Sequence, residues 1–310
     1  MAEKWLVVLG ATGQQGGSLI RYVLDSPSLS SKFRIRAVTR NPSDPRARAL
    51  EVEGVQVVQA DADDEESVRR AMRGASVAFS MTMPVFHDKN ARQREISQGR
   101  AIVDAAVAEG VEYIIFSTLP HVTKISNGKY QNVDYFDAKA EVEDYMRTLP
   151  IKSIFFCPGW FMQNFDQHMG LRTVDGELAL VNIVDPKTEL PLLDPNEDTG
   201  KFLGPVLEEP EKFVGQTLSA GERLYTYEEI AEIMSEVMGR PVQYKVVSKE
   251  EYVNNVPAIF GKRLIEMMLY LEEYGYYGPP STEEAVNRTV KLTKDKLTTF
   301  KAYLERQHRP

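Results

Sequence analysis

The chain has 310 residues, a formal net charge of −8 at pH 7 and a sequence pI near 5.3. Its 43% hydrophobic and 26% charged residues are typical of a soluble globular protein, and the acidic charge argues against direct binding of nucleic acid. No apolar run is long enough to span a membrane, and the N-terminal residues lack the features of a signal peptide. We therefore expect a cytoplasmic protein without a membrane partner, and we leave a nuclear location open.

The first half of the chain alternates apolar strand segments with amphipathic helices. The strand segments are residues 4–9, 33–39, 55–60, 76–81, 112–117 and 152–157. Helical segments at 14–24, 45–53, 64–72, 91–110 and around Lys139 separate them. Strict alternation with short links predicts parallel strands joined by right-handed crossovers. We predict an α/β fold, with a Rossmann-like doubly wound parallel sheet over residues 1–157 that binds NAD(P).

Beyond Pro158 this alternation ends. Short strand segments at 177–181, 217–220 and 242–247 mix with helical segments at 226–238, 258–274 and 296–307. Thr226 and Glu229 have the spacing of a capping box at the start of the first of these helices. We expect residues 158–310 to form a smaller mixed α/β lobe that completes a cleft, and we leave open that some of its segments return to the first domain.

The cysteine and the histidines give no sign of a metal site. A single cysteine, Cys157, excludes an intramolecular disulfide and fits a reducing compartment. Because apolar residues and a proline flank it, we expect a small buried side chain, with a redox thiol as the alternative. The four histidines, His87, His121, His168 and His308, lack ligand spacing, so we expect no metal. His87 lies in a predicted flap, residues 83–90, where we expect it to face solvent.

A glycine-rich turn follows the first predicted strand. Gly10, Gly13 and Gly16 form a G-x-x-G-x-x-G pattern between that strand and its helix. The first glycine permits the turn, the second lets the backbone approach a pyrophosphate, and the third lets helix and strand pack closely. Backbone N–H groups at the helix start would hold the phosphates. The pattern predicts a dinucleotide site, and the alternative is a turn needed only for packing.

Polar residues follow the next three strands. Arg40 ends the second strand, where NAD-preferring folds place an acidic residue that binds the ribose. Because a guanidinium matches a phosphate and a carboxylate would repel one, we predict NADP(H) over NAD(H). The alternative is that Arg40 is a solvated surface charge. Asp61, after the third strand, is placed to meet adenine, and Thr82, after the fourth, to line the path of the pyrophosphate and nicotinamide ribose.

These residues and their surroundings resemble the NmrA-like family, an atypical extended branch of the short-chain dehydrogenase/reductase superfamily. The family includes fungal nitrogen-metabolite regulators and an animal NADPH-sensing protein. The matching segments are LVVLGATGQQGGSL, RAVTRNP, VVQADADD, QGRAIVDAA, YFDAKAEVEDYM and CPGWFMQNF, with residues 211–239 in the second lobe. The resemblance implies a Rossmann-like domain with NADP(H) lying along the strand ends, in a cleft closed by the C-terminal lobe.

The resemblance also implies a set of cofactor contacts. They are Gly10, Ala11, Thr12, Gly13, Gln14, Gln15 and Gly16 around the pyrophosphate, Arg40 and Asn41 at the 2′-phosphate, Asp61 and Ala62 beside adenine, Thr82 at the middle of the cofactor, Lys139 at the nicotinamide ribose, and Phe161, Met162, Gln163 and Asn164 over the nicotinamide.

Tyr135 and Lys139 are the candidate catalytic residues. Their i, i+4 spacing places both on one side of a helix. In active members of the superfamily such a tyrosine transfers the proton, the lysine lowers its pKa and holds the ribose, and a serine polarises the substrate. The match places Leu119 at that serine position, so Thr118 or Thr123 would have to substitute. The alternative for Tyr135 is a ring packed on the cleft wall.

Two functions stay open at this point. The first is an NADP(H)-binding sensor or regulator that acts through a protein partner, and Leu119 favours it. The second is an NADPH-dependent oxidoreductase that reduces a carbonyl or an activated double bond of a small molecule, and Tyr135 favours it. We favour the first, and a reductase of specialised metabolism that also regulates is a third reading. A homodimer is left open.

Overall fold

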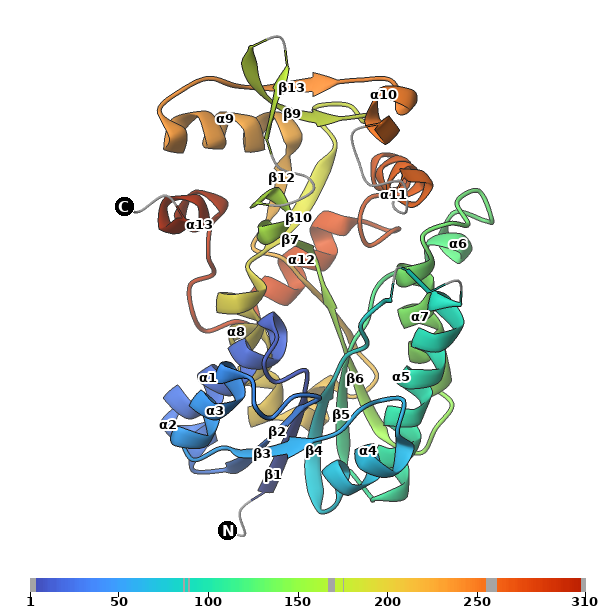
Figure 1. Ribbon diagram of the computed structural model, residues 1–310, viewed down its shortest axis with the longest axis vertical. Helices are drawn as coiled ribbons and strands as arrows, with labels where there is room; N and C mark the ends of the chain where they lie inside the picture. The colour runs from blue at the N-terminus through green and yellow to red at the C-terminus, as the bar shows by residue number, and fades with distance from the viewer. Residues whose placement is uncertain are drawn as a thin grey trace.

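The computed structural model describes residues 4–85, 87–88, 90–166, 171–174, 176–254 and 261–307. Its larger part is a seven-stranded parallel sheet in the order β11-β6-β5-β4-β1-β2-β3 with helices on both faces (Figure 1). This confirms the predicted doubly wound fold. The strands are β1 (Lys4–Leu9), β2 (Phe33–Thr39), β3 (Gln56–Gln59), β4 (Ala75–Ser80), β5 (Tyr113–Ser117), β6 (Lys152–Pro158) and β11 (Thr217–Ala220).

Alternate residues of β1 feed two separate cores. Leu6 and Val8 lie in the core beneath α1 and α8, whereas Val7 and Leu9 lie in the core beneath α4, α5 and α7. All four side chains are buried because both faces of a central parallel strand are covered. The helices of this part are α1 (Gln14–Asp25), α2 (Pro27–Ser30), α3 (Pro45–Val52), α4 (Glu65–Met72), α5 (Ala91–Ala108), α6 (Val122–Ile125), α7 (Asp134–Met146) and α8 (Pro195–Glu208).

The smaller part lies over the carboxyl ends of the sheet (Figure 1). It holds two three-stranded sheets, in the orders β12-β10-β7 and β13-β9-β8. The Thr226 hydroxyl accepts a bond from the Glu229 backbone N–H at 3.1 Å, which confirms the predicted helix start. Its elements are β7 (Trp160–Phe161), β8 (Arg172–Val174), β9 (Glu177–Asn182), β10 (Glu189–Leu193), β12 (Leu224–Thr226), β13 (Val242–Val246), α9 (Tyr227–Met238), α10 (Lys249–Asn254), α11 (Gly261–Tyr274), α13 (Phe300–Gln307) and the 3₁₀ helix η1 (Met162–Asp166). Helix α12 (Thr282–Val290) packs on β11, and the 3₁₀ helix η2 (Pro210–Phe213) follows α8 and packs on it.

Two segments beyond Pro158 belong to the larger part. Strand β11 pairs in parallel with β6, from Thr217 opposite Phe155 to Ala220 opposite Pro158. Helix α8 packs closely on α1, because Gly200 lies where a Cβ would come within 2.9 Å of the Tyr22 ring. These are the returning segments that the sequence left open.

Several sequence expectations concern single residues. Cys157 is buried as predicted, and burial raises the pKa of its thiol well above the usual value. His87 is exposed as predicted, whereas His168 and His308 lie outside the described residues. Within the described ranges, no helix is both long and apolar enough to cross a bilayer, and no group of three acidic, histidine or cysteine side chains is arranged to hold a metal.

Candidate functional site

Two positions of the turn between β1 and α1, Gly10 and Gly16, strongly favour glycine. Gly10 has a φ of +67°, in the left-handed region that favours glycine. A Cβ on Gly16 would lie 2.9 Å from the carbonyl carbon of Gly10, so helix and turn touch backbone to backbone. Ala11 is buried against β2, with its N–H bonded to the carbonyl of Val38 at 3.3 Å, and Thr12 is half-buried. The predicted geometry of the turn is therefore present.

The start of α1 suits an anion. Gly13 is the N-cap, no described side chain caps the helix, and its first turn contains no acidic residue. Exposed N–H groups and the positive end of the helix dipole therefore face the turn. Gln14 is half-buried, and the buried Gln15 accepts a bond from the Ser117 hydroxyl at 2.9 Å, which ties the turn to the end of β5. The residues present fit a dinucleotide pyrophosphate.

The residues predicted around the adenosine lie together at the paired ends of β2 and β3. Thr39 and Gln59 are the last residues of that pairing, and Arg40 and Asp61 follow them closely. Arg40 is exposed, and its backbone carbonyl accepts a bond from the Gln59 amide at 3.0 Å. Asn41 is exposed as well, and Asp61 and Ala62 are half-buried. The exposure of Arg40 fits the predicted phosphate contact and equally fits the alternative of a solvated surface charge.

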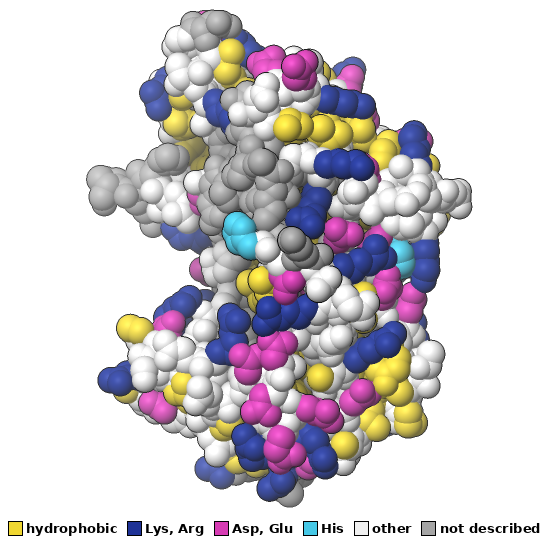
Figure 2. Space-filling view, turned by 45° about the vertical axis from the view of Figure 1, so that its right-hand side comes forward, with side chains coloured by type: hydrophobic (Ala, Val, Ile, Leu, Met, Phe, Trp, Pro, Cys, Tyr) yellow, Lys and Arg dark blue, Asp and Glu magenta, His cyan; other side chains and the backbone are white. Residues whose placement is uncertain are grey.

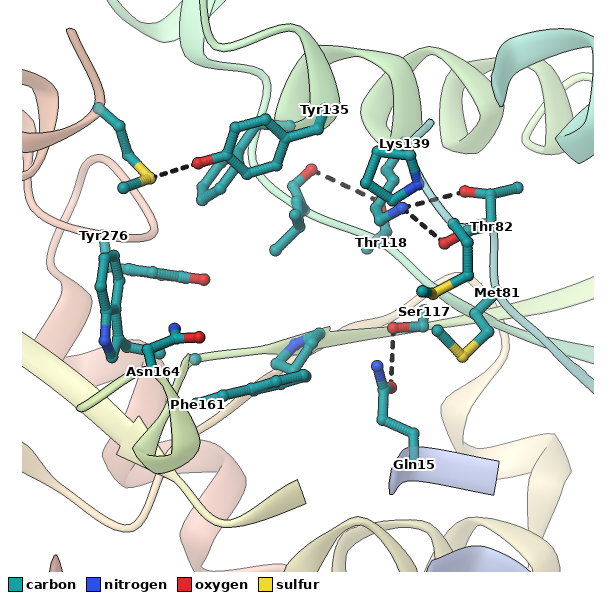
Figure 3. Close-up of a pocket in the computed structure, with 18 of the residues that line it drawn as sticks. Gln15, Met81, Thr82, Ser117, Thr118, Tyr135, Lys139, Phe161, Asn164 and Tyr276 are labelled. Atoms are coloured by element: carbon teal, nitrogen blue, oxygen red, sulfur yellow. Dashed lines mark hydrogen bonds between the residues drawn. The ribbon is translucent and has the colours of Figure 1, made fainter. Parts of the chain in front are cut away.

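A cavity of about 540 Å³ opens where β4, β5 and β6 end, between the two parts of the chain (Figure 3). The outer surface is indented between the same two parts, and acidic and basic side chains are interspersed around it (Figure 2). Most of the cavity wall is apolar. The described lining residues are Gln15, Met81, Thr82, Met83, Pro84, Ser117, Thr118, Leu119, Tyr135, Phe136, Lys139, Pro158, Gly159, Trp160, Phe161, Asn164, Arg263, Leu264, Met267 and Tyr276.

Lys139 is held in the cavity wall by a buried network. Its Nζ donates to the Thr82 carbonyl at 2.9 Å and the Thr82 hydroxyl at 3.0 Å, and it forms an ion pair with the Glu95 carboxylate. The Thr82 hydroxyl also lies 2.7 Å from Glu95 Oε1. The exposed fractions are 10% for the Lys139 side chain and 2% for that of Glu95. Lys139 and Thr82 thus meet as the predicted contacts require, with Glu95 as a third member.

Sequence reasoning missed Glu95, although one signal marks it. Glu95 falls on the buried stripe of α5, four residues before Gly99 and seven before Ile102. A carboxylate on such a stripe calls for a cationic partner. Gly99 allows that contact, because a Cβ there would lie 2.8 Å from Val142 of α7. Because α5 and α7 are this close at Gly99 and Val142, the side chains one turn earlier on each helix, Glu95 and Lys139, reach each other.

The Tyr135 hydroxyl does not meet Lys139. It lies 2.6 Å from the sulfur of Met267, and in Figure 3 it points away from the Lys139 amine. Burial raises the pKa of Tyr135, and the nearby charge of Arg263 opposes that rise only in part. The ring packs edge-to-face on Phe136 with centroids 5.1 Å apart. Both residues line the cavity, but the hydroxyl and the amine are not arranged as a proton-transfer pair.

Thr118 and Thr123, the two threonines considered as substitutes for a hydroxyl at the Leu119 position, differ in whether they line the cavity. Thr118 lines the cavity, as does Leu119 itself. Thr123 does not, because its hydroxyl and its N–H both bond to the buried carboxylate of Asp137. Thr118 is thus the candidate that the structure keeps at the wall.

Only half of the segment predicted over the nicotinamide faces the cavity. Phe161, the last residue of β7, and Asn164, in the 3₁₀ helix η1, line it. Met162 is fully buried in the core of the smaller part. Gln163 donates from its amide to the Asp194 carboxylate at 2.8 Å.

A model of the NmrA-like family matches residues 2–304. The chain belongs to the NmrA-like family. This confirms the resemblance drawn from its motifs.

Several known proteins are similar to this NmrA-like chain in sequence. An NmrA-like family domain-containing protein of Dictyostelium discoideum is 28% identical over 98% of both chains. The NmrA-like family domain-containing oxidoreductase FrzB of Cladobotryum sp is 26% identical, over 93% of this chain and 90% of the relative.

Two solved structures share the fold. NmrA, a negative transcriptional regulator crystallised with NADP, superposes with a TM-score of 0.80 at 21% identity, covering 98% of this chain and 95% of that one. Triphenylmethane reductase of Citrobacter sp., crystallised with NADP(H), gives 0.75 at 24% identity, covering 97% and 99%. Identities this low establish the shared fold and no more.

Proposed function

We propose that this chain is an NADP(H)-dependent oxidoreductase that acts on a small, largely apolar molecule. The observation that carries the proposal is the cavity of about 540 Å³ beside Lys139, walled mostly by apolar side chains. The predicted nicotinamide contacts Lys139, Phe161 and Asn164 line only part of this cavity. Its wall continues over Leu264, Met267 and Tyr276, and we assign that part to a second molecule beside the cofactor, which an enzyme needs and a pure sensor does not. Relatives from Cladobotryum sp and Penicillium ochrochloron are named oxidoreductases, which supports this choice.

The cofactor part of the proposal rests on the turn and on Arg40. The uncapped start of α1 and the backbone contact at Gly16 suit a pyrophosphate. Arg40, exposed at the end of β2, suits the 2′-phosphate and so favours NADP(H) over NAD(H). NmrA was crystallised with NADP and also with NAD, and triphenylmethane reductase with NADP(H), so these neighbours support a nicotinamide dinucleotide and the preference rests on Arg40 alone.

The chain's own residues would bind and orient. When bound, the reduced cofactor supplies a hydride; the acceptor takes this hydride and one proton, and the oxidised cofactor is the second product. The three N–H donors of Lys139 are taken up by Glu95 and Thr82, so Lys139 would clamp the nicotinamide ribose by exchanging a bond to Thr82 for one to a ribose hydroxyl. Phe161 and Trp160 in the wall would exclude water from the reacting carbon.

The source of the proton limits which classes of acceptor molecule the protein could reduce. Because the Tyr135 hydroxyl lies against Met267, it is not in place to donate a proton beside Lys139. The proton would then come from water at the cavity mouth, after the hydride has moved. Such a sequence requires an acceptor whose reduced anion is stable by itself, such as an enone or a quinone. An activated double bond is therefore favoured over a simple aldehyde.

Consumption of NADPH tests this function. We expect the purified chain to oxidise NADPH steadily with a quinone or an enone, and far more slowly with an aliphatic aldehyde. Lys139→Met should lower the rate at least tenfold by loosening the cofactor. Binding of NADPH without any turnover across such a panel would reject the enzyme and leave the second candidate.

The second candidate is a cofactor-dependent regulator that acts through a protein partner. The specific observation behind it is the separation of the Tyr135 hydroxyl from Lys139, together with Leu119 in the wall. A regulator must bind the two cofactor states differently, because only that difference can shift a partner equilibrium. Calorimetry with NADP⁺ and NADPH tests this: affinities equal within twofold would rule out a redox sensor.

A further inference from the structure

The charged groups in the cavity wall all have one sign. Among its described lining residues, Lys139 and Arg263 carry charge and none is acidic. The rest of the wall is largely apolar, so a charge placed there interacts more strongly than it would in water. The cavity therefore presents positive charge inside a weakly polar space, although the chain as a whole is acidic.

The two cations are not equivalent. Lys139 is already neutralised by the buried carboxylate of Glu95. Arg263, near the start of α11, has a guanidinium nitrogen 3.4 Å from Asp134 Oδ2, a longer contact. Asp134 lies in a small neighbouring pocket rather than in the cavity wall, and it is shared with Arg92 at 3.6 Å. Of the two cations, Arg263 is the more accessible, because 22% of its side chain is exposed against 10% for Lys139.

Aliphatic and aromatic side chains line the cavity together with Arg263. Leu264 and Met267 line the cavity from the same helix, and the rings of Tyr135 and Tyr276 line it nearby. Arg263 and Tyr135 line both this cavity and the small neighbouring pocket, which places the guanidinium near that ring. A guanidinium offers a planar fork to a carboxylate, and the rings offer faces to an unsaturated skeleton.

We propose that the substrate is a small aromatic or conjugated carboxylate whose acid group pairs with Arg263 while its unsaturated part lies against the apolar wall. This deepens the proposed function and rests on it, because the bound acid is a substrate only if the protein is an oxidoreductase. The pairing itself is a binding property and can be measured without turnover. Because a carboxylate accepts two parallel N–H bonds from arginine, loss of the fork should cost more than loss of one ordinary bond.

The test compares each acid with its uncharged amide. Benzoate, cinnamate and 2-naphthoate, and the three corresponding amides, are titrated by calorimetry into the full chain, with and without NADP⁺. We expect at least one acid to bind at least tenfold more tightly than its amide. Arg263→Leu should bring that ratio below about twofold, and Arg263→Lys should keep part of it.

The matched control is Arg240→Leu, which removes an exposed arginine between α9 and β13 and should leave the ratio unchanged. Unaltered thermal unfolding and NADP⁺ affinity show that the Arg263 variants are folded. Equal affinity for acids and amides, no binding of any acid, or a preference that survives Arg263→Leu would overturn the proposal. Turnover of neutral enones in that case would leave the oxidoreductase intact, whereas an acid preference without turnover would leave only the binding site.

Discussion

The carboxylate of Glu95 and the ammonium of Lys139 form a buried ion pair between α5 and α7, next to the cavity. The pair depends on Gly99, since a side chain there would push Val142 and α7 away. Burying two charges is tolerated only when further hydrogen bonds satisfy them, and Thr82 supplies these through its hydroxyl and its carbonyl. The fold thus fixes Lys139 at the cavity wall by itself.

Removing the charge of Glu95 should therefore destabilise the protein. We expect Glu95→Gln to lower the free energy of unfolding by about 3 kcal/mol, because it leaves the Lys139 ammonium buried without its counter-charge. Urea denaturation at pH 7 measures the change. The matched control is Glu66→Gln, which breaks an exposed pair with Arg70 and should cost less than about 1 kcal/mol. Equal effects of the two changes would contradict the network.

Gly16 and Gly17, which are neighbours at the start of α1, should respond differently to an added side chain. A Cβ on Gly16 would lie 2.9 Å from the Gly10 carbonyl carbon, whereas one on Gly17 would lie 3.5 Å from the Ala11 oxygen, an ordinary contact. We expect Gly16→Ala to weaken NADPH binding at least tenfold and Gly17→Ala to change it less than threefold. Fluorescence titration of NADPH measures both, and the idea fails if the two variants bind alike.

The position of the Tyr135 hydroxyl predicts a mild phenotype. Because the hydroxyl contacts Met267 rather than Lys139, Tyr135→Phe should keep the rate of NADPH oxidation within about threefold of the wild type, well under the usual effect of losing a general acid. Initial rates with a quinone provide the measurement. A loss of a hundredfold or more would show that the tyrosine transfers the proton after all.

Cofactor choice should follow Arg40. Arg40→Ala removes the guanidinium at the end of β2, so NADP(H) should bind about tenfold more weakly while NAD(H) changes little. Arg70→Ala, which removes an exposed arginine of α4, serves as the control. Parallel losses for both cofactors would mean that Arg40 does not meet the 2′-phosphate.

Asp137 should contribute to acid sensitivity. Burial by itself would raise the pKa of Asp137, but hydrogen bonds from His121 and Thr123 outweigh it and hold that pKa below its usual value. A lowered pKa gives stability that is present above the unfolded value, about 3.9, and is lost as the pH falls through the folded value. Asp137→Asn should therefore be less stable at pH 7 and lose less stability between pH 5 and pH 3. Identical pH profiles in urea denaturation would refute this role.

The sequence was sufficient for the larger part of the fold because its signals are local. Apolar strands alternate with amphipathic helices, and the turn at Gly10 can be recognised from its neighbours in the chain. The neighbour of a strand is not a local property. Residues 217–220 have a clear strand pattern, yet nothing in them says that β11 pairs with β6 of the larger sheet.

The candidate site divides in the same way. Gly16, Thr82 and Lys139 could be placed because each follows a predicted strand or occupies a known spacing on a helix. Arg263 could not, because it reaches the cavity only through the packing of the smaller part over the sheet. Met162 points into the core because it lies in a 3₁₀ helix, and the sequence of this segment does not predict that helix.

Transfer of hydride inside the cavity beside Lys139 is the step that defines the proposed oxidoreductase. The direct measurement is incubation of the purified chain, under anaerobic conditions, with a conjugated acceptor and NADPH carrying deuterium at the transferred C4 position. We predict that mass spectrometry finds one deuterium in the reduced product and that Lys139→Met forms this labelled product at least tenfold more slowly. NADPH that stays bound and unconsumed, or a reduced product without deuterium, would contradict it.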